Sequence, residues 1–332
     1  MTHPIIRRFR ELALVRSAKA CVRLPFAMAA TARERWSVSH PPPHELAVAA
    51  IFKDEAKNLA EWLTFHRGVG ASHFYLYNNN STDDFLTILQ PWIANGLVTL
   101  IDWPIVPGQR AAYLHCLRTR WREAKWIAFI DIDEFLFSPA QVDIRPILRS
   151  YADVPALYVY SVRFGSSGHV TRPNMPVVQA YVRRAPFGIM DTGKSIVNPR
   201  FVRDVPNAHH FTLWRGRTVD AKRRRTQSPR GKPAPDRMPV YDLLRINHYF
   251  YKSREDLLEK TKRGDAFYGL QREFDRDLQW DDIANSEEDC AILSIWQEIV
   301  RADRLNPAFV GTSGECQSAP NGRRSNTGRS QS

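Results

Sequence analysis

The sequence has few cysteines and lacks the loops of several common enzyme classes. Its 332 residues include four cysteines, Cys21, Cys116, Cys290 and Cys316, and none of them forms a Cys-x-x-Cys pair. This spacing argues against a structural zinc site and a disulfide scaffold, and it favours a reducing compartment such as the cytosol. The absence of Gly-x-Gly-x-x-Gly and Walker-type loops disfavours a dinucleotide oxidoreductase and a P-loop NTPase.

Long apolar runs are missing as well. No stretch reaches the ~18 uninterrupted apolar residues of a membrane span, and the N-terminus has no compact apolar segment with a small-residue cleavage site. We therefore expect a protein that is neither transmembrane nor exported. The hydrophobic fraction of 43% and the charged fraction of 25% are typical of a globular protein with a real core.

The positive charge is concentrated in two segments. Of the formal net charge of +12, residues 1–37 carry +6 and residues 215–237 carry +7, which leaves −1 for the rest. A folded nucleic-acid-binding domain carries its basic stripe on the domain itself, so we expect no nucleic-acid partner. The two segments could instead dock the protein peripherally on an anionic membrane surface, or simply be solvated.

Composition divides the chain into an arm, a domain and a tail. Residues 1–43 form a basic arm that ends in three prolines, and residues 4–16 fit either an amphipathic surface helix or a disordered arm. A domain follows at 44–300, with a donor half at 44–137, an acceptor half at 138–300 and a basic insertion at 215–238. Residues 311–332 contain too little apolar material to fold, and we expect a disordered tail.

Extended and helical patterns alternate from residue 46 onwards. We expect strands at 46–52, 73–77, 97–103 and 126–130, with helices around 59–66, 83–93 and 110–123, and later helices at 254–264 and 290–300. Alternation of this kind makes right-handed crossovers, which predicts an α/β fold with a mostly parallel central sheet and helices on both faces.

An apolar run that ends in three carboxylates is the main candidate site. Trp126 to Ile130 predicts a buried strand, and ligands of α/β sheets bind at the carboxyl ends of such strands. On strand alternation Asp131 and Asp133 point the same way, which suits Mg²⁺ or Mn²⁺ on a diphosphate. The acids could instead cap a strand and open a turn, or serve a metal-dependent phosphoryl transferase or hydrolase.

Polar segments also follow the first two strands. Lys53-Asp54-Glu55 follows the first strand, and residues 78–83 follow the second, so both should lie near the acids. Asparagine side chains can hydrogen-bond a base or ribose edge, whereas Ser81, Thr82 and Asp83 can also cap the following helix.

Short motifs occur in a fixed order over roughly residues 46–265. They are Phe52-Lys53-Asp54-Glu55, Asn79-Asn80-Ser81-Thr82-Asp83, Gln109-x-x-x-Tyr113-x-x-Cys116, Asp131-x-Asp133-Glu134-Phe135, Phe164-Gly165-Ser166-Ser167-Gly168-His169, Gly193-Lys194-Ser195-Ile196-Val197 and Asn247-His248-Tyr249. Together they resemble glycosyltransferase family 92 and the broader family 2-like transferases with the GT-A fold. The resemblance implies transfer of a sugar, galactose with inversion in animal members, from a nucleotide-diphosphate donor that is commonly UDP-linked to a glycan or glycolipid acceptor.

The resemblance also implies roles for single residues. A divalent cation, Mn²⁺ or Mg²⁺, would be held by Asp131, Asp133 and His248, although His248 could be an ordinary core histidine. The expected contacts to the nucleotide sugar are Lys53, Asp54, Glu55, Asn79, Asp83, Gln109 and Asp131.

The second half should supply the catalytic base and the acceptor site. We expect Asp191, in a glycine-flanked segment, to be the base, although it could be a turn residue, and Asp204 and Glu134 remain candidates. Gly165, Ser166 and His169 should lie in an acceptor-side loop, unless the glycines only make turns. A non-enzymatic alternative is a membrane- or nucleic-acid-docking module that uses the two basic segments.

Overall fold

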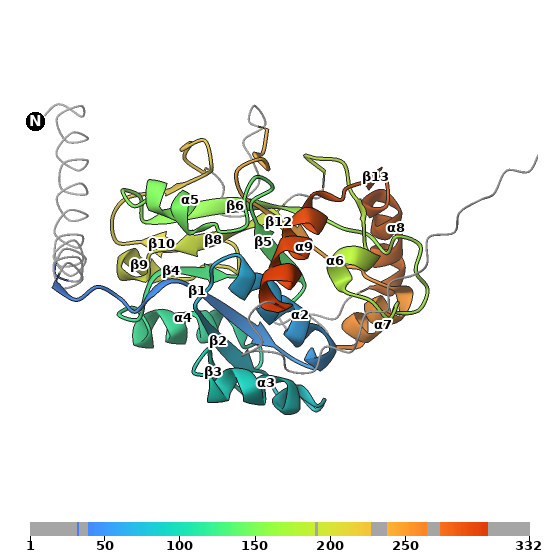
Figure 1. Cartoon of the computed structure of the whole chain (residues 1–332), viewed down its shortest axis with the longest axis horizontal. Coiled ribbons are helices and arrows are strands. Elements are labelled where there is room, and N and C mark those ends of the chain that lie inside the picture. The colour runs from blue at the N-terminus through green and yellow to red at the C-terminus, as the bar shows by residue number, and fades with distance from the viewer. Residues whose placement is uncertain (1–31, 33–38, 190–191, 227–237, 264–272, 305–332) are drawn as a thin grey trace, which may run out of the picture.

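The structure contains one large mixed α/β sheet with helices on both of its faces (Figure 1). The computed structural model describes residues 32, 39–189, 192–226, 238–263 and 273–304. Several expectations therefore lie outside the described residues: the helix or arm at 4–16, Asp191, residues 227–237 of the basic insertion, and the tail at 311–332. The predicted α/β class, with a mostly parallel sheet, is confirmed.

Four parallel strands form the first half of the sheet in the order β3-β2-β1-β4. They are β1 (His44–Phe52), β2 (His73–Asn78), β3 (Val98–Asp102) and β4 (Ala124–Phe129). The helices between them are α2 (Ala56–Gly68), α3 (Phe85–Ala94) and α4 (Gln109–Thr119). The predicted alternation is therefore confirmed, with small shifts at the ends of the elements.

The second half of the sheet mixes directions. Strand β8 (Thr192–Val197) pairs antiparallel with β4 and with β6 (Ala156–Arg163). Strand β12 (Arg245–His248) runs parallel to β6 and antiparallel to β5 (Glu134–Phe137), and β11 (Thr218–Val219) also pairs with β6. The remaining elements are α5 (Arg145–Ser150), α6 (Val177–Ala180), β7 (Arg183–Arg184), η1 (Pro199–Phe201), β9 (Val202–Asp204), β10 (Thr212–Leu213), α7 (Arg254–Arg263), α8 (Phe274–Ala284), β13 (Glu287–Glu288) and α9 (Ala291–Arg304).

Apolar side chains fill a layer on each face of the sheet. On one face α2 and α9 bury large aromatic side chains, among them Trp62, Phe65 and Trp296. A Cβ at Gly68 would lie 2.5 Å from Ile299 Cγ1, so a glycine is needed where these two helices cross. On the other face α4 packs Tyr113 against Phe129 of β4, with ring centroids 4.7 Å apart.

The acidic segment forms a turn and does not continue strand β4. The Glu134 N–H donates to the carbonyl of Asp131 at 3.0 Å, and β5 starts at Glu134. Strand alternation therefore does not apply, and the expectation that Asp131 and Asp133 point the same way is wrong. Ile132 is buried in the core.

The described part of the basic insertion lies along the sheet. Strand β11 pairs with β6, Arg223 forms an ion pair with Asp153 at 2.8 Å, and Arg224 forms one with Asp220 at 2.7 Å. These two arginines are thus partly neutralised.

In the part of the chain that the structure describes, we find no helix that is long and apolar enough to cross a membrane.

Candidate active site

The loops after β1 and β2 are joined into one unit at the carboxyl end of the sheet. Asp54 Oδ1 accepts from the Thr82 N–H at 2.6 Å, and Ser81 Oγ accepts from the Asp54 N–H at 3.0 Å. Asp83 Oδ2 accepts from the Ala56 N–H at 2.7 Å, so it caps the start of α2. The expectation that Asp83 caps the following helix is wrong: the N-cap residue of α3 is Asp84, whose side chain makes no capping hydrogen bond.

Asn79 holds the segment that leads into α4. Its side-chain amide donates to the carbonyls of Trp103 and Ile105 at 2.6 and 2.9 Å, and the residue is buried. Its predicted contact with uridine stays a prediction, as do those of Asp54 and Asp83 and of the exposed Lys53. The contacts observed for Asn79 fix the start of α4, which carries Gln109 into the site.

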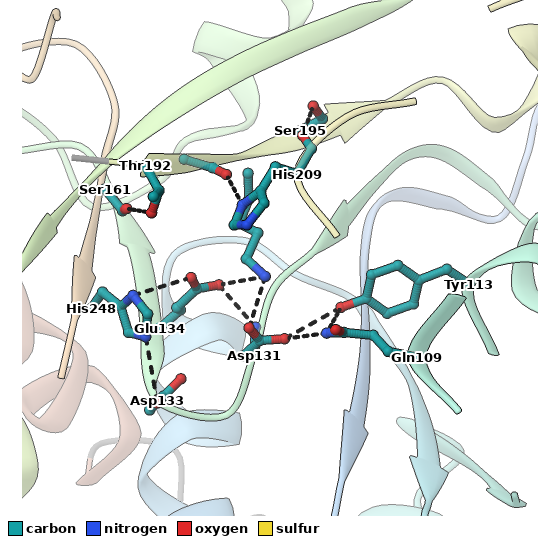
Figure 2. A network of polar contacts seen from close by, with 12 residues as sticks. Gln109, Tyr113, Asp131, Asp133, Glu134, Ser161, Thr192, Ser195, His209 and His248 are labelled. Atoms are coloured by element: carbon teal, nitrogen blue, oxygen red, sulfur yellow. Dashed lines mark hydrogen bonds and ion pairs between the residues drawn. The ribbon is translucent and has the colours of Figure 1, made fainter. Parts of the chain in front are cut away.

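Asp131 lies in a polar cage made by α4 and β8 (Figure 2). Gln109 Nε2 donates to Asp131 Oδ1 at 2.8 Å, and the Tyr113 hydroxyl lies 3.4 Å from the same oxygen. The other oxygen, Oδ2, accepts from Lys194 Nζ at 2.7 Å. Gln109 therefore lies beside Asp131, and its expected contact with the nucleotide sugar stays a prediction.

Lys194 is the buried cation of this cage, with 2% of its side chain exposed. Burial disfavours its charged form, but Asp131 and Glu134 outweigh burial and hold the pKa of the ammonium well above its usual range. Burial also opposes the charge on Asp131, yet Lys194 keeps the pKa of that carboxyl low. Burial raises the pKa of Glu134 to about 8. At neutral pH the cage therefore holds one ammonium and one carboxylate, with Glu134 mostly protonated.

Asp133 has different partners from Asp131, on β12 and α7. Its Oδ2 lies 3.5 Å from His248 Nε2 and accepts a hydrogen bond from Lys260 Nζ. Burial disfavours its charge, but Lys260 and His248 hold the pKa of the carboxyl well below its usual range. Burial lowers the pKa of His248 to about 4, so the ring is neutral at pH 7.

Asp133 and His248 fit two ligands of a divalent cation. His248 is neutral, as a ligand must be, and its Nδ1 has no hydrogen bond, lying 3.6 Å from Glu134 Oε1. Asp131 fits less well, because Gln109 and Lys194 already occupy its two oxygens. Among the described residues no group of three or more His, Cys, Asp and Glu side chains is arranged to hold a metal, so further ligands would come from the substrate and water.

The residues expected to bind the acceptor have structural contacts. Ser166 donates through its N–H and hydroxyl to Asp281 of α8, at 2.7 and 2.6 Å. A Cβ at Gly165 would lie 2.5 Å from the side chain of Asn285, and His169 Nε2 lies 3.1 Å from the carbonyl of Ala180. Their role toward an acceptor stays a prediction. Asp204, a candidate base, forms an ion pair with Arg110 at 2.9 Å.

Sequence reasoning missed the lysines of the site. Lys194, Lys252 and Lys260 all lie near the acids, but none was assigned a role. A signal exists for Lys194, since a charged side chain next to the apolar Ile196 and Val197 is unusual in a buried strand. Lys252 and Lys260 follow His248 in a helical region with several lysines and arginines, where no local pattern singles them out.

Comparison with known proteins identifies relatives. The model of a family described as Glycosyltransferase family 92 matches residues 43–229, which are 187 of the 332 residues. A family 92 protein of Ricinus communis is 29% identical over 234 residues, covering 68% of this chain and 39% of that protein. A galactan β-1,4-galactosyltransferase of Arabidopsis thaliana is 34% identical over 106 residues, covering 28% of this chain and 20% of that protein. The chain thus spans well under half the length of these curated relatives.

The solved structures that match include that of S. aureus TarS, residues 1–349. It has 11% sequence identity and a TM-score of 0.34, and the match covers 81% of this chain and 75% of that chain.

Proposed function

We propose, because this chain belongs to glycosyltransferase family 92, that it transfers a hexose from a UDP-linked donor to a glycan or glycolipid acceptor. One observation carries the proposal: Asp131, Asp133 and His248 lie close together at the end of the sheet (Figure 2). The loops after β1 and β2, which are hydrogen-bonded to each other, end at the same edge of the sheet. Galactose is the sugar we favour, since one relative is named a galactan β-1,4-galactosyltransferase.

Asp133 and His248 are the residues that would hold a divalent cation in this proposal. When bound, such a cation neutralises charge on the departing diphosphate. A histidine ligand beside a carboxylate favours Mn²⁺ over Mg²⁺, because Mg²⁺ prefers an all-oxygen shell. Asp131, held in place by Gln109 and Lys194, would hydrogen-bond the hydroxyl groups of the donor as a fixed acceptor.

Asp191 is our proposed general base for an inverting transfer. It directly precedes β8, which delivers Lys194 to Asp131 and whose Thr192 hydroxyl lies 2.9 Å from that of Ser161. A base must reach the attacking hydroxyl of the acceptor. Glu134 is less suited, because its side chain is only 1% exposed and its pKa is raised to about 8 by burial.

A donor panel tests the proposal. The full chain is incubated with UDP-galactose, UDP-glucose, UDP-N-acetylglucosamine or GDP-mannose, with and without Mn²⁺ and β-galactan oligosaccharides, and both nucleotide release and product mass are measured. We expect transfer from one UDP-sugar and a loss of activity of at least about tenfold in Asp133→Asn. The control Asp153→Asn, at an exposed carboxylate, should change the activity little. Release of nucleotide without any glycan product would indicate a hydrolase, and no sugar-nucleotide turnover at all would refute the proposal.

A further inference from the structure

Three lysines line a pocket next to Asp133. Lys57 comes from α2, Lys260 comes from α7, and Lys252 lies just before α7. Glu55, Asn58, Phe250, Asp256 and Glu259 also line this pocket.

Lys252 is the unusual member of this set. It is 93% buried and has a left-handed backbone, with φ 51°. Among the hydrogen bonds and ion pairs of the described residues, none involves its ammonium group, whereas Lys57 pairs with Asp256 at 2.8 Å. A left-handed non-glycine residue costs free energy, and such costs concentrate at functional sites.

Lys260 occupies the oxygen that a cation would need. Its Nζ hydrogen-bonds Asp133 Oδ2, the same oxygen that faces His248 Nε2 at 3.5 Å. An ammonium and a divalent cation repel each other at such short range, so the two cannot share this oxygen. If Asp133 and His248 hold a cation, the Lys260 ammonium must move.

The diphosphate of the donor is the natural new partner for Lys260. It reaches the site together with the cation, and lysine ammonium groups bind phosphate as compact point charges. Lys252 already lies in the same pocket, where its charge lowers the pKa of Asp256 and of Asp133 without a hydrogen bond to either.

We propose that Lys252 and Lys260 form the diphosphate-binding site, and that Lys260 is an exchangeable counter-ion of Asp133. Without donor, Lys260 neutralises Asp133; when the cation binds Asp133 and His248, Lys260 moves to the diphosphate, which Lys252 also binds. The diphosphate part rests on the proposed function, whereas the competition between Lys260 and the cation does not.

Calorimetry on the full chain tests both parts. The titrants are Mn²⁺ alone, UDP with saturating Mn²⁺, and UMP with saturating Mn²⁺. The variants are Lys260→Met, Lys252→Met and Lys252→Arg, and the control is Lys262→Met, an exposed lysine on the same helix. Thermal unfolding of each variant without ligand checks that it is folded.

The two lysines should respond differently. Lys260→Met should bind Mn²⁺ alone several-fold more tightly, because a competing cation has gone, yet bind UDP roughly tenfold more weakly. Lys252→Met should change Mn²⁺ binding less than Lys260→Met does, because Lys252 makes no hydrogen bond to Asp133, and it should also weaken UDP binding roughly tenfold, while Lys252→Arg keeps most of the UDP affinity. UMP lacks the second phosphate, so both Met variants should weaken the binding of UMP less than the binding of UDP. Lys262→Met should bind both nucleotides as the wild type does.

The outcomes separate the two parts of the proposal. Unchanged or weaker Mn²⁺ binding in Lys260→Met would overturn the idea that Lys260 and the cation compete for Asp133, whether or not any donor binds. Wild-type UDP affinity in both Met variants overturns the diphosphate site. If the wild-type protein binds Mn²⁺ but not UDP, the proposed function fails together with the diphosphate site, and the Mn²⁺ titration of Lys260→Met still decides the exchange.

Discussion

Replacing Lys194 with methionine should show that the Asp131 cage depends on one buried charge. The substitution keeps the length of the side chain but leaves the carboxylate of Asp131 without the ammonium that now lies 2.7 Å away. Removing one partner of a fully buried ion pair typically costs about 3–5 kcal/mol, and because 33% of the Asp131 side chain is exposed we expect a smaller loss of about 2–3 kcal/mol. At roughly 2 °C or more per kcal/mol for a domain of this size, we expect the melting temperature to fall by about 4–6 °C.

The loss should depend on pH in a defined direction. Lys194 lowers the pKa of Asp131, so this carboxyl contributes stability above its unfolded value of 3.8 and loses it as the pH falls. The pKa of Lys194 is raised, so the lysine contributes below its unfolded value of 10.5 and loses this as the pH rises through its folded pKa. Both contributions are therefore present near neutral pH. In the variant the carboxyls can take up protons at low pH, so the loss should be smaller at a pH of about 5 than at about 8.

The loss of stability is measured by urea denaturation at both pH values. The proteins compared are the wild type, Lys194→Met, Asp131→Asn and the double variant. The double variant carries no uncompensated charge and should be more stable than Lys194→Met alone, which is a coupling that the single variants cannot show. Lys262→Met serves as an exposed lysine control. A loss below about 1 kcal/mol, equal at both pH values, would refute the reasoning, because a surface pair behaves in that way.

Three further predictions follow from other contacts. Gly68→Val should destabilise the protein by about 1–3 kcal/mol in urea denaturation, because its Cβ would lie 2.5 Å from Ile299 Cγ1. Adding Ile299→Ala should restore part of the lost stability, and additive losses would contradict this packing. His248→Ala should leave metal-free stability little changed, because Nδ1 has no hydrogen bond, but remove most of the thermal stabilisation by Mn²⁺ plus UDP; an intact increment would exclude a ligand role. Sedimentation with vesicles should show binding to anionic but not neutral lipid, weakened by salt, through residues 1–37 and 215–237, and equal binding to neutral vesicles would argue against docking by charge.

The first half of the fold could be predicted because its strands are buried on both faces. Such strands appear in the sequence as continuous apolar runs, as in Ala47 to Phe52 and Trp126 to Ile130, and amphipathic helices separate them. The arrangement of Asp131 and Asp133 could not be predicted in this way. Alternation holds only while the backbone stays extended, and the hydrogen bond from the Glu134 N–H to the Asp131 carbonyl closes a turn.

Contacts between distant residues were predictable only from the order of motifs. The motif order placed Gln109 and His248 near the acids, and the structure brings Gln109 to 2.8 Å from Asp131 and His248 to 3.5 Å from Asp133. Local periodicity contains no information on which strands pair. The register that sets His248 opposite Glu134 joins β12 to β5 across a large part of the chain.

The lysines of the site show why counting charge is not enough. The rest of the chain outside the two basic segments has a net charge of −1, which predicts nothing about buried cations. Yet Lys194 reaches Asp131 because β8 is inserted between β4 and β6, and Lys260 reaches Asp133 from α7. All three acids of the turn lie in the donor half, whereas the cations and the histidine that neutralise or contact them come from the acceptor half. Residues 44–137 alone would leave these carboxyls without compensation, so the donor site can form only when both halves of the sheet have folded together.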